Sequence, residues 1–225
     1  MSLLPIFTRV LVCPILLLGL TSCVDLAGSG LSKEKQKAMA HIASPEAGEV
    51  HTMRGGLGVF SKGMNKLRDS ASDRFQIPSS SAMWYNAGAV TQSIVAYRQK
   101  TGRVRPIILV GHSLGANEQI KVARSLNKLG VSVDLLVTVD AVSQTRIPPN
   151  VKHALNLYKP GWVPMFSGLR LVAVDPRKTR IDNINVATLP GMHTNHFTID
   201  KETAVQDKIL DEIHKVLAYE NTSRG

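Results

Sequence analysis

Cysteine is scarce in this sequence. Only Cys13 and Cys23 occur among 225 residues, and both lie near the beginning of the chain. Residues 24–225 therefore contain neither a disulfide framework nor a cysteine-ligated metal centre. The same absence excludes a cysteine nucleophile from that part of the chain.

Acidic residues are also few: 17 Asp and Glu stand against 27 Lys and Arg, which gives a formal charge of +10. This balance favours contact with anionic surfaces such as lipid headgroups, cell-wall polymers or nucleic acid. The basic residues are scattered, and neither a zinc-finger spacing nor an aromatic–basic RNA-binding signature accompanies them, so we do not expect nucleic-acid binding. The sequence lacks repeats and low-complexity tracts, and its length fits one globular domain.

The beginning of the sequence has the pattern of a targeting segment. Arg9 precedes an apolar run over residues 10–20, which is shorter than the roughly 20 residues of a membrane span but has the size of the apolar region of a signal peptide. The run ends in Leu20-Thr21-Ser22-Cys23, which resembles the bacterial lipobox. The resemblance implies cleavage before Cys23 and acylation of its thiol, and several acyl chains anchor a protein stably to a membrane. The alternative is an ordinary secretory signal cleaved near Ser22.

These patterns predict three parts of the chain: a lipoprotein signal peptide over 1–22, a tether over 23–45 and a folded domain over 46–225. The tether is rich in glycine and serine, which makes a chain flexible. We expect the protein at the bacterial cell envelope. Val24 after the cysteine favours the outer membrane, by the sorting pattern of such lipoproteins.

Residues 46–225 alternate between strand-like and helix-like patterns. Continuous apolar runs such as 106–110 are typical of strands buried on both faces, and 204–219 has an amphipathic helical pattern. Such alternation predicts an α/β fold with a mostly parallel sheet flanked by helices, and its ligand site lies at the carboxyl ends of the strands. We expect strands at 49–54, 74–77, 106–110, 133–139, 154–158 and 183–187, and helices at 61–70, 87–100, 113–129 and 204–219.

A G-x-S-x-G motif, Gly111-His112-Ser113-Leu114-Gly115, follows the strand at 106–110 and opens a helix. Such a turn holds the serine in a strained conformation with its hydroxyl exposed, and the helix start directs backbone N–H groups at developing negative charge. His112 is interpreted as the variable residue of the motif. The pattern predicts that Ser113 is a nucleophile.

The motif and its strand–turn–helix setting resemble the α/β-hydrolase superfamily, on its lipase, esterase and thioesterase side, over roughly residues 48–219. The family order is serine, acid, histidine. Asp140 directly follows the strand at 133–139 and is the favoured acid, with Asp175 as its competitor. Asp182 lies at the start of a predicted strand, at the wrong end of the sheet.

Two histidines, His193 and His196, lie in the loop before the last predicted helix, where the family places its base. His196-Phe197 resembles the His-Phe motif that closes many thioesterases and lipases, so His196 is favoured and His193 is the alternative. The family builds its oxyanion hole from two backbone N–H groups. Leu114 and, in the glycine-rich stretch 55–58, Leu57 are the expected donors. That stretch lacks the Lys-Ser/Thr pair of a P-loop and the spacing of a dinucleotide site.

The resemblance implies a serine hydrolase that cleaves carboxylic esters or thioesters through Ser113, His196 and Asp140, without a metal or an organic cofactor. The apolar segment 159–178 is expected to rim the cleft and to suit an acyl substrate. Two alternatives remain open. An acyltransferase would pass the acyl group to an acceptor other than water, and a non-catalytic envelope lipoprotein would use the same fold to bind a ligand.

Overall fold

The computed structural model describes residues 47–56 and 61–224, with side chains up to residue 219. The predicted signal peptide, the tether and Cys23 lie outside the described residues, as does Leu57. Within the described ranges, no helix is both long and apolar enough to cross a membrane.

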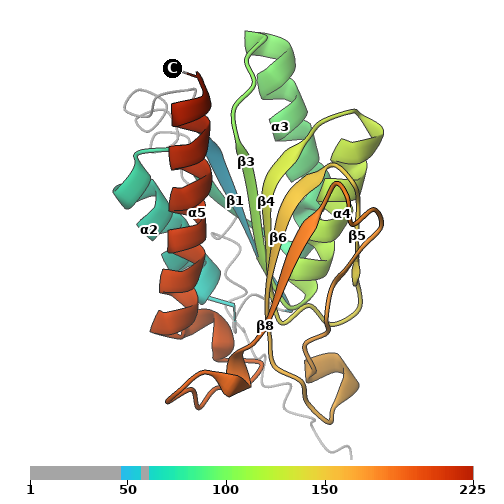
Figure 1. Cartoon of the computed structure of the whole chain (residues 1–225), viewed down its shortest axis with the longest axis vertical. Coiled ribbons are helices and arrows are strands. Elements are labelled where there is room, and N and C mark those ends of the chain that lie inside the picture. Colours follow the sequence, from blue (N-terminus) through green and yellow to red (C-terminus); the bar gives the residue numbers. More distant parts are fainter. Residues whose placement is uncertain (1–46, 57–60, 225) are drawn as a thin grey trace, which may run out of the picture.

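A six-stranded sheet forms the centre of the molecule (Figure 1). Its order is β2-β1-β3-β4-β6-β8, and all its neighbouring strands run parallel. All the carboxyl ends therefore meet at one edge of the sheet. The strands are β1 (Glu49–Arg54), β2 (Ser79–Met83), β3 (Ile107–His112), β4 (Val133–Val139), β6 (Val151–Tyr158) and β8 (Arg180–Asn185).

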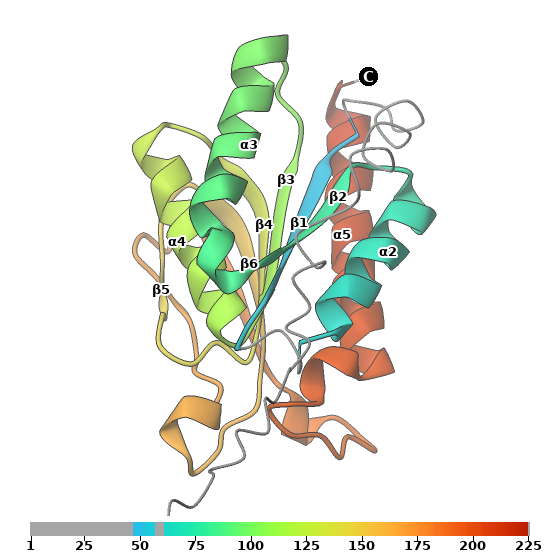
Figure 2. The ribbon, with the colours of Figure 1, turned by 180° about the vertical axis from the view of Figure 1, so that it is seen from behind.

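Helices cover both faces of the sheet (Figures 1 and 2). The helices α2 (Gly63–Phe75) and α5 (Thr203–Arg224) pack on one face, and α3 (Ala87–Thr101) and α4 (Leu114–Lys128) on the other. Alternate residues of β3 enter opposite cores: Ile108 packs with α2 and α5, and Leu109 packs with α3 and α4. The apolar run is continuous because this central strand is buried on both faces. The predicted α/β fold with a mostly parallel sheet flanked by helices is confirmed.

Smaller elements lie outside the central sheet. The two-residue strands β5 (Arg146–Ile147) and β7 (Val172–Ala173) pair with each other. The short 3-10 helices are η2 (Trp84–Asn86), η3 (Pro164–Phe166), η4 (Val186–Thr188) and η5 (Ile199–Lys201). The loop that carries η3 and the loop between η4 and η5 both extend beyond the lower end of the sheet in Figure 1.

The predicted strand at 74–77 is wrong. Residues 74 and 75 are the last turn of α2, which continues beyond the predicted end at residue 70. Gln76 ends the helix in the left-handed conformation, with φ 53°, and its N–H donates to Ser72 O. The strand begins five residues later than predicted, at Ser79, as an edge strand paired with β1.

Candidate active site

Ser113 sits in the sharp turn between β3 and α4. Its backbone adopts φ 57° and ψ −124°, a conformation that costs a non-glycine residue about 1–3 kcal/mol. The turn is held from the neighbouring strand, because the Ser113 N–H donates to Val139 O at 2.9 Å. Gly115 lets β1 approach the turn closely: a Cβ at this position would lie 2.3 Å from Met53 O. The sheet thus stabilises the strained turn and brings Ser113 to the carboxyl edge.

Asp140 follows β4 directly and is fully buried. Its backbone also lies in the left-handed region, with φ 53°. Its N–H donates to Leu157 O at 2.9 Å, and its Oδ1 accepts the Lys159 N–H at 2.7 Å. The adjacent strand β6 and the residue that follows it therefore fix the position of this carboxylate.

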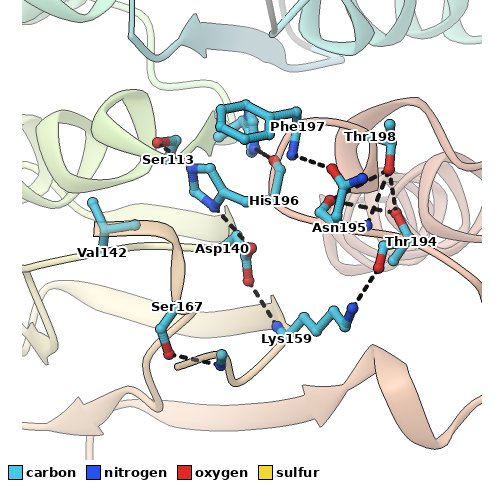
Figure 3. Close-up of polar contacts among 12 residues, drawn as sticks. Ser113, Asp140, Val142, Lys159, Ser167, Thr194, Asn195, His196, Phe197 and Thr198 are labelled. Carbon is cyan, nitrogen blue, oxygen red and sulfur yellow. Dashed lines mark hydrogen bonds and ion pairs between the residues drawn. The ribbon is translucent and has the colours of Figure 1, made fainter. Parts of the chain in front are cut away.

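The imidazole of His196 lies between Ser113 and Asp140 (Figure 3). Its Nε2 is 2.8 Å from Ser113 Oγ, and its Nδ1 is 2.9 Å from Asp140 Oδ2. A carboxylate only accepts hydrogen bonds, so Nδ1 carries a proton and the lone pair of Nε2 faces the serine hydroxyl. This arrangement is able to take a proton from a serine nucleophile and to stabilise the resulting imidazolium.

Local polar residues hold His196 in place. Asn195 Oδ1 accepts the Phe197 N–H at 2.8 Å, and Thr198 Oγ1 accepts the Asn195 N–H at 3.1 Å. The Lys159 Nζ donates to Thr194 O at 2.5 Å, which ties the histidine loop to the residue whose N–H holds Asp140. Figure 3 shows these contacts on one side of the histidine.

The structure places the competing residues elsewhere. His193 is exposed, in the same loop as His196. Asp175 is paired with Arg177 at 3.1 Å, and the Arg177 contacts hold the pKa of its carboxyl below the usual range. Asp182 contacts His153 Nε2 at 2.9 Å from β8. Of the candidate acids, only Asp140 contacts His196 within the described residues.

Leu114 is the first residue of α4, where backbone N–H groups have no partner inside the helix. It lines a cavity together with Ser113. The second predicted donor, Leu57, lies outside the described residues. The Gly55 N–H is not available for this role, because it donates to Ser61 Oγ at 3.1 Å.

The side chain of His112 has a structural role that was not predicted from the sequence. Its Nδ1 lies 2.7 Å from Ser61 Oγ, and its Nε2 lies 2.8 Å from the backbone oxygen of His196. The carbonyl only accepts, so Nε2 carries the proton and Nδ1 accepts from the Ser61 hydroxyl. Burial, with a smaller contribution from the nearby His196, lowers the pKa of His112 to about 3, which keeps this ring neutral. Through Ser61 and Gly55, the ring joins the glycine-rich loop after β1 to the loop of His196.

The structural role of Asn117 was also not predicted from the sequence. Its Oδ1 lies 3.2 Å from each of three successive backbone N–H groups, those of Val142, Ser143 and Gln144. These contacts shape the loop that follows Asp140. Nothing in the sequence around the motif predicts this role of Asn117. For His112 one signal was present, because it is a polar ring at the end of an otherwise apolar buried strand.

Asp200 is a buried carboxyl behind the histidine loop. Its Oδ2 accepts the N–H of Gly63, the first residue of α2, at 2.8 Å, and its Oδ1 has no hydrogen-bond partner among the described residues. Burial raises its pKa from 3.8 to about 6, against the opposing effect of the Gly63 N–H. Asp200 therefore ties α2 to the segment that carries His196.

No group of three or more His, Cys, Asp and Glu side chains arranged to hold a metal ion occurs in the part of the chain that the structure describes. The segment 159–178 does rim the site, since Met165 and Phe166 line the cavity that contains Ser113. The Phe166 ring packs against His196 in a tilted arrangement, with ring centroids 5.4 Å apart.

No model of a known protein family and no curated protein matches this sequence. Several solved structures are similar in their fold. The type II thioesterase BorB from the borrelidin biosynthetic cluster is 12% identical, with a TM-score of 0.45 over 76% of this chain and 93% of its own. Human thioesterase 2 is 10% identical, with a TM-score of 0.43 over 76% and 97%. A cutinase from Trichoderma reesei, solved with a phosphonate inhibitor, is 15% identical, with a TM-score of 0.39 over 88% and 90%.

Proposed function

We propose that this protein is a serine hydrolase that cleaves carboxylic esters or thioesters and is anchored to the bacterial cell envelope. Ser113 is the nucleophile, His196 the general base and acid, and Asp140 the residue that orients the imidazole. Leu114 N–H is one oxyanion donor, and Leu57 N–H is the expected second.

One observation supports this function most strongly: a continuous line of polar contacts from a strained serine to a buried carboxylate. Ser113 Oγ, His196 Nε2, His196 Nδ1 and Asp140 Oδ2 follow one another at 2.8 and 2.9 Å. The three side chains come from positions up to 83 residues apart in the chain. The backbone of Ser113, with φ 57° and ψ −124°, is strained for a non-glycine residue, and strain of this kind clusters at functional sites.

The proposed reaction has two halves. Ser113 Oγ attacks the acyl carbonyl carbon while its proton passes to His196 Nε2, and the oxyanion is stabilised by the Leu114 N–H. The bond from the acyl carbon to the leaving oxygen or sulfur then breaks, and the leaving group takes the proton from His196. Water next loses a proton to His196 and attacks the acyl-enzyme. The acid departs, and Ser113 recovers its proton. An acyl acceptor other than water in the second half would make the protein an acyltransferase.

Ester hydrolysis by the full-length chain in detergent tests this function. With p-nitrophenyl butyrate, we expect Ser113→Ala and His196→Ala each to lower kcat by about 10⁴-fold or more, as in other enzymes whose triad residues act as a unit. Ser93→Ala is the matched control, because the Ser93 hydroxyl donates to Val90 O within α3, away from the candidate site, and activity should be unchanged. Full activity of Ser113→Ala would refute the assignment. A wild-type protein that turns over no ester would instead favour the ligand-binding lipoprotein.

The anchor is tested separately. Cells grown with a fatty-acid analogue are expected to label the wild-type protein and Cys13→Ser, which loses only the other cysteine, but not Cys23→Ser. The membrane fraction should retain the first two proteins and lose the third. Equal labelling of Cys23→Ser would refute lipidation at this residue without bearing on the hydrolase.

A further inference from the structure

Two cavities open on either side of His196. The inner cavity has a volume of about 130 Å³ and contains Ser113 and Leu114, and its walls include Val142 and Met165. The outer cavity, of about 350 Å³, contains neither Ser113 nor Leu114. Its walls include Lys159, Trp162, Val163 and Asn195.

The two cavities share three residues, which separate them: Phe166, His196 and Phe197. Their rings are mutually packed, with centroids 5.0 Å apart for Phe166 and Phe197 and 5.4 Å apart for Phe166 and His196. Phe166 belongs to the short helix η3 in the exposed loop after β6. Its ring takes no part in the proposed proton transfer, and, unlike Phe197, Phe166 is not adjacent to His196 in the chain.

The proposed chemistry assigns a role to each cavity. The carbonyl oxygen of a bound ester must face the Leu114 N–H, so the acyl chain continues into the inner cavity, on the side of Leu114 and Val142. The leaving oxygen must face His196 Nε2, because this atom gives it a proton. The leaving group therefore extends past the histidine towards the outer cavity.

The walls of the two cavities differ in character. The inner walls around Val142, Met165 and Phe166 are almost wholly apolar, which suits a hydrocarbon chain. The outer cavity adds the polar side chains of Lys159 and Asn195 and the exposed indole of Trp162. This lining suits a larger, partly polar leaving group.

The size of the inner cavity limits the chain that it holds. An apolar protein cavity of about 150 Å³ accommodates benzene, with its six carbon atoms. A cavity of about 130 Å³ therefore encloses an acyl chain of roughly six carbons. A longer chain meets the Phe166 ring or leaves the cavity for water, and its additional methylene groups gain no further burial.

We infer that the enzyme is selective for esters of short acyl chains, up to about hexanoyl, with Phe166 as the residue that sets the limit. This inference rests on the proposed hydrolase function and narrows its substrate class. Short chains are bound by burial in the inner cavity, and the alcohol or thiol portion occupies the outer cavity.

The test is a profile of kcat/KM for p-nitrophenyl esters from acetyl to dodecanoyl, at concentrations below micelle formation. The leaving group is constant, so the profile reports the acyl side alone. For the wild type, we expect kcat/KM to rise roughly fourfold with each methylene until about hexanoyl, as burial of a CH₂ predicts, and then to stop rising. Phe166→Ala joins the two cavities, so its kcat/KM should continue to rise to decanoyl.

Two further variants make the result specific. Val163→Ala is the matched control, because Val163 lines only the outer cavity, and its profile should break at the wild-type length. Val142→Phe fills the inner cavity and should move the break towards acetyl. A wild-type profile that rises without a break, or an unchanged break in both Phe166→Ala and Val142→Phe, would overturn this inference while leaving the hydrolase intact. Failure of the wild type to turn over any ester or to react with a fluorophosphonate would overturn the proposed function and this inference with it.

Discussion

Replacement of His112 by phenylalanine removes the polar contacts of a buried ring while keeping its approximate volume. Two hydrogen bonds are lost, the one that His112 Nε2–H donates to His196 O and the one that Nδ1 accepts from Ser61. A buried polar group left without a partner costs about 1–3 kcal/mol. We expect His112→Phe to lower the free energy of unfolding by about 2–4 kcal/mol at pH 8.

The catalytic consequence is predicted to be larger than a loss of stability alone would give. His112 holds the backbone of His196, and a displacement of about 1 Å in a catalytic group lowers the rate by roughly 100-fold. We expect kcat for p-nitrophenyl butyrate to fall about 10- to 100-fold with little change in KM. The matched control is His153→Phe: His153 is also a buried histidine, but it contacts Asp182 and Arg180 in β8, so its loss should reduce stability and spare kcat.

The pH dependence separates positioning from direct proton transfer. Because the pKa of His112 is lowered to about 3, its ring is neutral between pH 5 and pH 9, and the acidic limb of kcat should be the same in His112→Phe and the wild type. Stability behaves differently. The contribution of the neutral His112 ring to the free energy of unfolding is fully present above pH 6.5 and is lost as the pH falls towards 3, because the unfolded chain then binds a proton that the folded chain does not. His112→Phe lacks this group, so its free energy of unfolding should fall less than that of the wild type between pH 6.5 and pH 3. An unchanged kcat, or a shifted acidic limb, would refute the positioning role.

Three further predictions concern other parts of the site. Asp140→Asn should lower kcat by about 10⁴-fold in the same ester assay, because the amide no longer favours the proton on His196 Nδ1, and near-normal activity would contradict this role. Asp200→Asn should raise the free energy of unfolding at pH 8 by up to about 3 kcal/mol. The folded pKa of about 6 lies above 3.8, so the stability that the protonated carboxyl contributes is lost as the pH rises through 6. Urea titrations would exclude this burial cost if the effect of Asp200→Asn on the free energy of unfolding were the same at pH 3.5 and pH 8. Gly55→Ala places a Cβ 2.4 Å from His112 O and should lower the free energy of unfolding, measured by thermal unfolding, by about 1–3 kcal/mol. In the control Gly88→Ala the new Cβ meets no atom within 4 Å, so no loss of stability is expected. Equal effects of the two substitutions would refute close packing at the turn.

The central strands, and the position of the site at their carboxyl ends, were predictable because they depend on local sequence patterns. A continuous apolar run marks a strand buried on both faces, and residues 107–112 and 133–139 form such strands. Parallel strands bring their carboxyl ends together, so the positions directly after them were expected to meet. The described geometry does place Asp140 and Ser113 around one imidazole, that of His196.

Other features depend on tertiary contacts that a linear pattern does not contain. The strand β2 consists of Ser-Ser-Ser-Ala-Met, without a β-branched residue, and it exists because its backbone pairs with β1. Its position is also set by α2, which runs on to Phe75 because that side chain packs against the apolar core. The role of His112 depends on the backbone oxygen of a residue 84 positions away. Side-chain contacts over such distances in sequence leave no periodic pattern.

The most direct test of the account is covalent labelling of Ser113. The full-length protein is incubated with a fluorophosphonate and digested, and the modified residue is located by mass spectrometry. The account predicts a single adduct on Ser113 in the wild type, loss of the adduct in Ser113→Ala, and strongly slowed labelling in His196→Ala. A folded wild-type protein without an adduct on Ser113, or one labelled as fast after removal of His196, would contradict it.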